Sequence, residues 1–144
     1  MAFTVTSLSS YSSVKTFAAR VSKLPRLDVV LENAGIGTPI WGLAEGHERT
    51  ITVNVIRTFL LALLLLPKLK ATAKEFKAEP RLTIVPSETH AWTKFSELKE
   101  PNTFDALDRE SAPHFYERYH TSKLLEILVI RAIGASPPKL LDQL

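Results

Sequence analysis

Tyr119 and Lys123 are the two side chains in this sequence that are best suited to carry out chemistry together. They stand four positions apart in the run Tyr-His-Thr-Ser-Lys, so on a helix they project from one face. A tyrosine hydroxyl has an ordinary pKa of about 10, which is too high for proton transfer at neutral pH unless its anion is stabilised. The ammonium of Lys123 would stabilise that anion. The same spacing also arises by chance on many helices, so the pair must be weighed with the rest of the chain.

Other polar residues stand at the ends or in the middle of apolar segments. Asn33, Ala34 and Gly35 follow one apolar run, Ser87 follows another, and Asn54 lies inside a long helical pattern. Ligands of open parallel sheets bind where the strands end, so both turns are candidate site positions. Structural alternatives exist, because Ser87 also suits a turn after a proline and Asn54 also suits a helix cap. The apolar pattern continues on both sides of Asn54, which argues against the cap.

Short apolar runs predict the strands that carry these turns. Residues 27–31 (LDVVL) and 82–85 (LTIV) have the β-branched, continuously apolar form of buried parallel strands. Residues 2–6, in which Phe and Val alternate with Thr, predict a third, shorter strand.

Helical patterns precede, separate and follow the two longer runs. The first begins after Ser9 or Ser10 as the N-cap, with Val14, Phe17, Ala18 and Val21 on one face. The second covers residues 45–76 and is expected to kink or divide at Pro67.

The last helix is predicted over residues 116–133, stopped by Gly134, and residues 93–113 are expected to form a long loop. The alternation of helices with buried strands predicts an α/β fold with an open parallel sheet.

Composition places the chain among ordinary globular domains. Its 144 residues are 45% hydrophobic and 23% charged and include no cysteine, which excludes a disulfide scaffold, a thiolate nucleophile and a Cys-type zinc site. A net charge of +3 with scattered basic residues argues against nucleic acid as a partner. The apolar run at residues 59–66 is too short to span a bilayer, and the first residues lack a secretory-signal pattern. We expect one cytoplasmic domain over residues 1–144, and no metal at His114 or His120, which lack ligand spacing.

The order of these motifs resembles the short-chain dehydrogenase/reductase family. The resemblance covers about residues 7–135, and the long loop after Ser87 and the leucine run are most similar to the retinol-dehydrogenase-like branch, including its fungal members. It implies a Rossmann-type sheet and hydride transfer between NAD or NADP and a ketone or alcohol. The substrate would be small and lipophilic, of the kind met in secondary metabolism.

The resemblance also implies a role for each candidate residue. Tyr119 would be the general acid or base, and Lys123 would stabilise its anion and bond the nicotinamide ribose. Ser87 would hold the substrate oxygen, and Asn54 would anchor a water molecule in a proton relay. The turn of Asn33, Ala34 and Gly35 would line the adenosine side of the cofactor, where Gly35 allows a close backbone approach.

The sequence departs from the family pattern in several places. It contains no TGxxxGxG turn for the pyrophosphate, and Ser7 stands where an acidic residue usually contacts adenine. Glu32 replaces the first Asn of the usual Asn-Asn-Ala-Gly and adds a negative charge beside the cofactor. We therefore expect a partial Rossmann-type, incomplete dinucleotide-binding domain without the N-terminal Gly-rich βαβ unit and the C-terminal strands. Such a chain is not expected to bind NAD or NADP alone.

In the family, the strands of the sheet lie in the order 3-2-1-4-5-6-7. The resemblance implies that residues 27–31 are the fourth strand and residues 82–85 the fifth, so the two should be neighbours. This order would also leave the outer edge of the first of these strands unpaired and expose Val29, Val30 and Leu31 to water.

Two kinds of function are consistent with these features. One is an oxidoreductase of this family; the alternative is a catalytically inactive remnant that acts as a partner of a complete homologue. The helices around Asn54 and Tyr119 would provide the surface for such a dimer, or for a homo-oligomer. Completion by a separately encoded N-terminal half is a weaker alternative.

Overall fold

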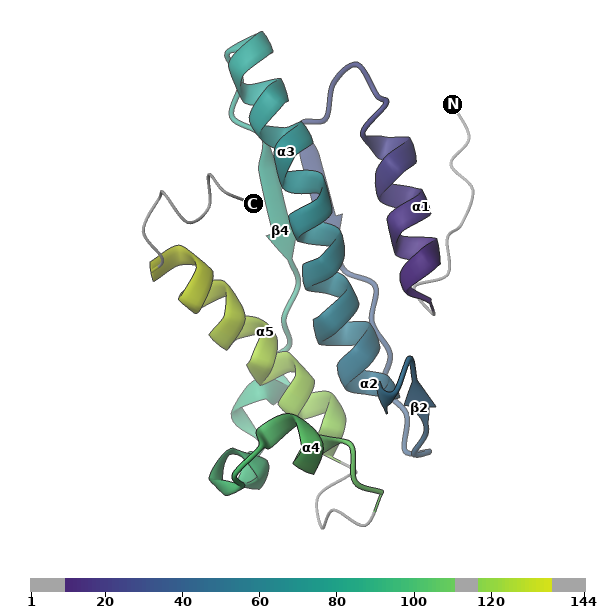
Figure 1. Ribbon diagram of the computed structural model, residues 1–144. Helices are drawn as coiled ribbons and strands as arrows, with labels where there is room; N and C mark the ends of the chain where they lie inside the picture. Colours follow the sequence, from purple (N-terminus) through teal and green to yellow (C-terminus); the bar gives the residue numbers. More distant parts are fainter. Residues whose placement is uncertain (1–9, 111–116, 136–144) are drawn as a thin grey trace.

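The computed structural model describes residues 10–110 and 117–135. Its helices lie on one side of a two-stranded parallel sheet, as Figure 1 shows. The predicted α/β class is therefore confirmed, while the expected strand at residues 2–6 falls outside the described residues.

The sheet consists of β1 (Val29–Glu32) and β4 (Arg81–Ile84), close to the two predicted runs. They pair in parallel, with Val30 opposite Leu82. The predicted adjacency of the two strands is confirmed, and it brings the turn after β1 and the turn after β4 to the same end of the sheet.

One long helical segment crosses the middle of the molecule. It begins with α2 (Arg49–Ile51), passes through the π-helical segment η1 (Thr52–Arg57), and continues as α3 (Thr58–Phe76). Pro67 lies inside α3, which it does not divide. The leucines on either side, Leu65 and Leu69, are buried, and their packing offsets the hydrogen bond that proline removes.

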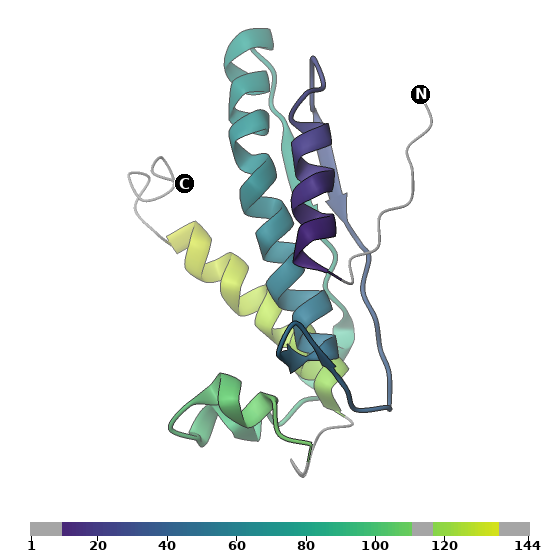
Figure 2. The same ribbon diagram turned by 45° about the vertical axis from the view of Figure 1, so that its right-hand side comes forward.

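The first predicted helix is α1 (Tyr11–Val21), and Ser10 caps it by accepting a hydrogen bond from the Ser13 amide. Its buried face, Val14, Ala18 and Val21, packs against Leu61 and Leu65 of α3. Figure 2 shows α1 and α3 side by side on the same side of the strands.

The last helix, α5 (Arg118–Ala135), packs on the other flank of the long segment. It runs through Gly134 to Ala135, two residues beyond the predicted end at residue 133, so the predicted stop at Gly134 is wrong. A second core cluster forms here from buried apolar side chains of the long segment, of α5 and of the region between β4 and α5, namely Ile51, Val55, Phe59, Phe95, Leu107 and Leu125.

The region expected to be a long loop is partly helical. It contains η3 (Ser96–Lys99) and α4 (Thr103–Leu107), and η2 (Glu88–Ala91) lies just before it. Arg118 pairs with Glu97 and donates to the Leu107 carbonyl at 3.1 Å, which ties these short helices to the start of α5. The loop prediction is wrong here, because the anchoring contacts come from residues distant in sequence.

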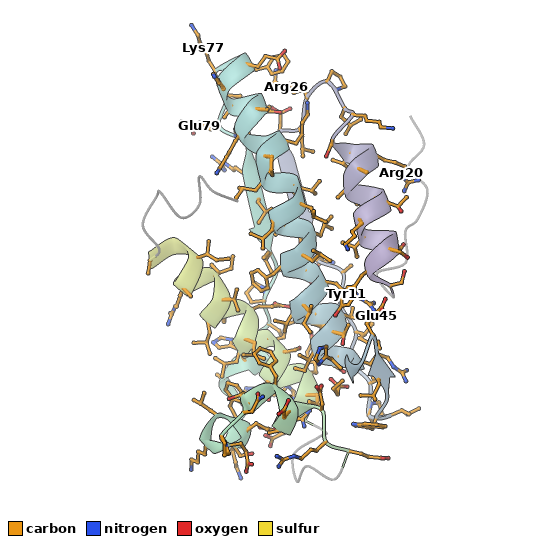
Figure 3. All side chains as sticks on the ribbon, viewed as in Figure 1. Tyr11, Arg20, Arg26, Glu45, Lys77 and Glu79 are labelled. Carbon is orange, nitrogen blue, oxygen red and sulfur yellow. The ribbon has the colours of Figure 1, made fainter. Side chains whose placement is uncertain are left out.

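A small hairpin precedes α2. Its strands, β2 (Leu43–Ala44) and β3 (His47–Glu48), are joined by Glu45 and Gly46, both with positive φ, as a tight primed turn requires. The carboxylate of Glu45 accepts the Tyr11 amide at 2.9 Å, and Figure 3 shows these two residues next to each other where α1 begins. The sequence analysis did not predict β2 and β3, because strands of two residues are too short to show an alternation of apolar and polar residues.

The outer edge of β1 is unpaired among the described residues, as expected, and one face of the sheet is open. Val29 and Leu31 are 64% and 63% exposed. Val30, which was expected in water as well, is half-buried against the α1–α3 cluster. Alternate residues of a strand point to opposite faces, so only one of the two faces is uncovered.

The helical segment Arg49–Phe76 has the length and hydropathy of a membrane-crossing helix. However, 67% of its most apolar part is buried by the rest of the molecule. It therefore has the character of a central core helix.

Candidate active site

Tyr119 and Lys123 lie on one face of the first turns of α5, as their spacing predicts. The ammonium nitrogen of Lys123 is 5.8 Å from the centroid of the Tyr119 ring. Lys123 is buried and Tyr119 is half-buried. The pair can therefore interact electrostatically while the phenol remains accessible.

A cavity of about 260 Å³ lies in front of this pair. Its lining residues come from α5 and from the turn after β1, and they are Asn33, Gly35, Ile36, Gly37, Tyr119 and Lys123. Four of the five residues predicted to contact a cofactor, namely Asn33, Gly35, Tyr119 and Lys123, thus line one cavity together with Ile36 and Gly37. Ala34 is exposed and is not among the lining residues.

Close packing leaves little room for a side chain at two glycines of this cavity. A Cβ atom on Gly35 would lie 3.0 Å from the Asn54 side-chain oxygen, and one on Gly37 would lie 3.2 Å from the Tyr119 ring. Larger side chains would fill the space in front of the tyrosine. The cavity volume lies below the range of about 300–1,000 Å³ usual for whole small-molecule ligands.

Asn54 is fully buried in η1 and positions the same turn. Its side-chain oxygen accepts the Ile36 amide at 2.8 Å, and its nitrogen donates to the Ile36 carbonyl and to Ser122 Oγ, each at 2.9 Å. Both amide hydrogens are therefore engaged within the protein. This places Asn54 as the link between the turn after β1 and α5; its role in holding a relay water stays a prediction.

Ser87 lies after β4 and caps η2. Its hydroxyl accepts a hydrogen bond from the Thr89 hydroxyl at 3.1 Å. It does not line the cavity, but η2 packs against α5, and the Trp92 and His120 rings meet edge to face with centroids 5.5 Å apart. The structure thus places Ser87 in the segment next to the Tyr119 helix turn, and its contact with a substrate oxygen stays a prediction.

Glu126 is a site residue that the sequence analysis did not identify. Lys123 donates to its two carboxylate oxygens at 2.9 and 3.2 Å, and to the Val85 carbonyl at 3.2 Å. Burial raises the pKa of the Glu126 carboxyl, while the hydrogen bond and charge of Lys123 act against this shift. The sequence feature that could have identified Glu126 is its position three residues after Lys123, because side chains at this spacing are neighbours on a helix.

Glu32, at the end of β1, adds a second carboxyl close to this pair. Burial and the negative charge of Glu126 raise the pKa of Glu32 to about 8. Its Oε1 atom is buried and has no hydrogen-bond partner among the described residues. The expected negative charge beside the cofactor is therefore largely suppressed at neutral pH.

Among residues 10–110 and 117–135, no group of three or more His, Asp or Glu side chains is arranged to hold a metal ion. His120 lies next to Tyr119, with ring centroids 6.0 Å apart. His114 lies outside the described residues.

Comparisons with known proteins identify relatives over most of the chain. The chain is 48% identical to the short chain dehydrogenase atnD of Emericella nidulans over 88% of its own length and 41% of that protein. It is 43% identical to the short chain dehydrogenase/reductase dmxR8 of Cryptosporiopsis, covering 91% of the chain and 42% of dmxR8. It is also 43% identical to the short chain dehydrogenase sol3 of Alternaria solani, covering 88% and 45%.

The chain thus spans about two fifths of the length of these relatives. No family model matches the chain. No solved structure matches it either.

Proposed function

Because the chain belongs to the short-chain dehydrogenase/reductase family over the region it shares with these fungal relatives, we propose that it provides the proton-transfer part of an NAD(P)-dependent oxidoreductase. The reaction interconverts a carbonyl and an alcohol on a small lipophilic substrate. The observation that carries the proposal is the placement of Tyr119 and Lys123 on one face of α5, beside a glycine-lined cavity. The partial Rossmann-type fold of the chain places that cavity at the carboxyl end of β1, where ligands of such sheets bind.

A nicotinamide cofactor held by the turn of Asn33 and Gly35 would supply the hydride for the carbonyl carbon in the reducing direction. Tyr119 Oη gives its proton to the carbonyl oxygen, which becomes the alcohol, and the phenolate then regains a proton from water. In the opposite direction, the same oxygen takes the alcohol proton. Lys123 stabilises the phenolate between these steps because its ammonium faces the ring.

The remaining residues position the reactants. Ser87 holds the substrate oxygen from the turn after β4. Asn54 fixes the turn of Ile36 through two hydrogen bonds and joins it to Ser122 on α5 through a third. Asn33 and Gly35 line the space for the cofactor. Trp92, which is 62% exposed beside His120, offers an apolar surface that a lipophilic substrate would cover.

The activity is tested on the longest reading frame that contains this sequence, obtained by sequencing the transcript. An in-frame glycine-rich turn ahead of Met1 supports the proposal, since it would provide the pyrophosphate site. The purified product is given NADPH or NADH and a panel of lipophilic ketones, and the loss of nicotinamide absorbance is followed. A folded protein that oxidises neither cofactor with any ketone, and reduces neither with the matching alcohols, would refute the proposal.

A role as a partner of a complete homologue is the second candidate. The exposed Val29 and Leu31 on the open sheet face favour it, since an apolar face of this kind is stabilised by a covering surface. Size-exclusion chromatography with and without a complete homologue separates the two candidates. A chain that elutes as a monomer in both runs would exclude the partner role.

A further inference from the structure

Ser87 is held by hydrogen bonds from the residues that follow it in η2. Its side-chain oxygen accepts from the Thr89 hydroxyl at 3.1 Å and from the Thr89 amide at 3.4 Å. Its backbone carbonyl accepts from the His90 amide at 3.1 Å and from His90 Nδ1 at 2.7 Å. Four donors on two neighbouring residues thus fix both oxygens of Ser87.

These contacts leave one hydrogen-bonding group of the Ser87 side chain available. A serine hydroxyl has one hydrogen to donate and two lone pairs with which to accept. The two donors of Thr89 match the two lone pairs. Within residues 10–110 and 117–135, the Ser87 hydroxyl donates its own hydrogen to no other group. Toward a ligand, the Ser87 side chain can therefore act only as a donor.

We infer that Thr89 is a positioning residue, whose hydroxyl occupies Ser87 Oγ so that the Ser87 hydroxyl presents its hydrogen, and not a lone pair, to the substrate oxygen. The inference rests on the proposed function, in which Ser87 holds that oxygen. The hold of Thr89 on Ser87 does not depend on the proposed function, and it can be measured without cofactor or substrate.

A fixed donor suits the charge that develops during the reaction. The carbonyl oxygen gains negative charge as its carbon is reduced, and a donor already in place stabilises that charge without having to reorient. A serine hydroxyl that rotates freely would lose this advantage. Because the hydrogen bond is strongest when the charge has developed, Thr89 should affect kcat more than KM.

The end of this segment is also tied to the helix that carries Tyr119. Thr93 Oγ1 lies 2.8 Å from Thr121 Oγ1, and Thr121 is buried two positions after Tyr119 on α5. η2 itself packs against α5. A hydroxyl that is fixed within η2 is therefore also fixed relative to the first turns of α5.

The first test is kinetic and uses the longest reading frame that contains the chain. Thr89→Val removes the hydroxyl and keeps the branched shape, and it should lower kcat for ketone reduction about tenfold with KM nearly unchanged. Thr89→Ser restores the hydroxyl and should recover most of kcat. Thr16→Val, at an exposed threonine on α1, is the matched control and should leave both constants unchanged. A wild-type kcat in Thr89→Val, or an equal loss in Thr89→Ser, would overturn the inference.

The second test follows the Ser87 side chain itself in ¹³C- and ¹⁵N-labelled chain. Three-bond couplings to the Ser87 β protons report the χ1 angle, and Ser87→Ala assigns the signals. Ser87 should hold one staggered rotamer in the wild type and in Thr89→Ser, and should average over rotamers in Thr89→Val. Thr89→Ala makes the same removal if Thr89→Val does not fold. A single Ser87 rotamer in a folded variant without the hydroxyl would overturn the inference.

The two tests separate the inference from the proposed function. Averaging of Ser87 in Thr89→Val, with a wild type that turns over neither ketones nor alcohols, would support the hold of Thr89 on Ser87 and refute the proposed function. An active wild type whose Thr89→Val variant keeps both kcat and the Ser87 rotamer would overturn the inference alone.

Discussion

At the residue scale, the site is held by polar side chains whose hydrogen-bonding groups are satisfied inside the protein. Asn54 uses both amide hydrogens, and Lys123 uses all three ammonium hydrogens. The Tyr119–Lys123 face was predictable from spacing alone, since it depends on one helix. The bonds of Asn54 to Ile36 and Ser122 were not, because they join residues 18 and 68 positions apart.

Asn54→Ala should lower the free energy of unfolding by about 2–3 kcal/mol, because it leaves the Ile36 amide and carbonyl without partners. Ser122→Ala removes only one of the bonds of Asn54 and should cost less. Chemical denaturation of the two variants and the wild type measures the difference. Equal losses would show that the turn after β1 is not held by Asn54.

Glu32 makes the stability depend on pH. Its pKa is raised from 4.5 to about 8 in the folded chain, so between these values the folded state keeps a proton that the unfolded state has lost. The free energy of unfolding should therefore fall as the pH rises through this window, by about 1 kcal/mol per pH unit.

Glu32→Gln should flatten this dependence and stabilise the chain at pH 8, as measured by urea denaturation at several pH values. Glu79→Gln, at an exposed position, should leave the slope unchanged. A slope that is the same in Glu32→Gln and the wild type would show that Glu32 is not the group responsible.

At the element scale, the strands and the three long helices followed from sequence patterns, and the short elements did not. The β1 and β4 runs and the Ser10 cap were predicted because each signal is local. The π-helical turns of η1, the β2–β3 hairpin and α4 depend on distant contacts, such as that of His47 Nδ1 with Asp108 Oδ2 at 2.8 Å. The same reason explains why Pro67 does not divide α3, since packing against α1 outweighs local propensity.

The interface between α1 and α3 should therefore account for much of the stability. Leu65 is 2% exposed at this interface, while its neighbour Leu64 is 36% exposed. Leu65→Ala should cost about 2–5 kcal/mol in the free energy of unfolding, and Leu64→Ala about 1 kcal/mol or less. Thermal or chemical denaturation of the pair compares the same chemical change on one helix, and similar losses would contradict the packing described.

At the scale of the whole molecule, the sheet has helices on one face only, and both outer strand edges are unpaired among the described residues. The family strand order predicted this adjacency and the unpaired outer edge of β1, because it makes β1 and β4 neighbours. The partial burial of Val30 could not be predicted from the strand order, because it depends on where α1 and α3 pack on the sheet. Exposed apolar side chains on so small a sheet favour association with another surface.

The chain should consequently self-associate as its concentration rises, and Val29→Lys with Leu31→Lys should suppress this by charging the open face. The matched control is Leu128→Lys with Ile130→Lys, at similarly large exposed side chains on α5. Analytical ultracentrifugation of the three proteins measures the association. Suppression by the control alone would place the contact surface on α5 instead.

The proposed function depends most on the Tyr119 hydroxyl, and the most direct measurement is kcat/KM for ketone reduction by Tyr119→Phe in the longest reading frame, together with NADPH binding. The hydroxyl should be worth about 10²–10⁴-fold in kcat/KM, with cofactor affinity nearly unchanged and full activity in Tyr11→Phe, which alters a tyrosine beside Arg57. A Tyr119→Phe enzyme as active as the wild type would contradict the assignment of Tyr119 as the proton donor.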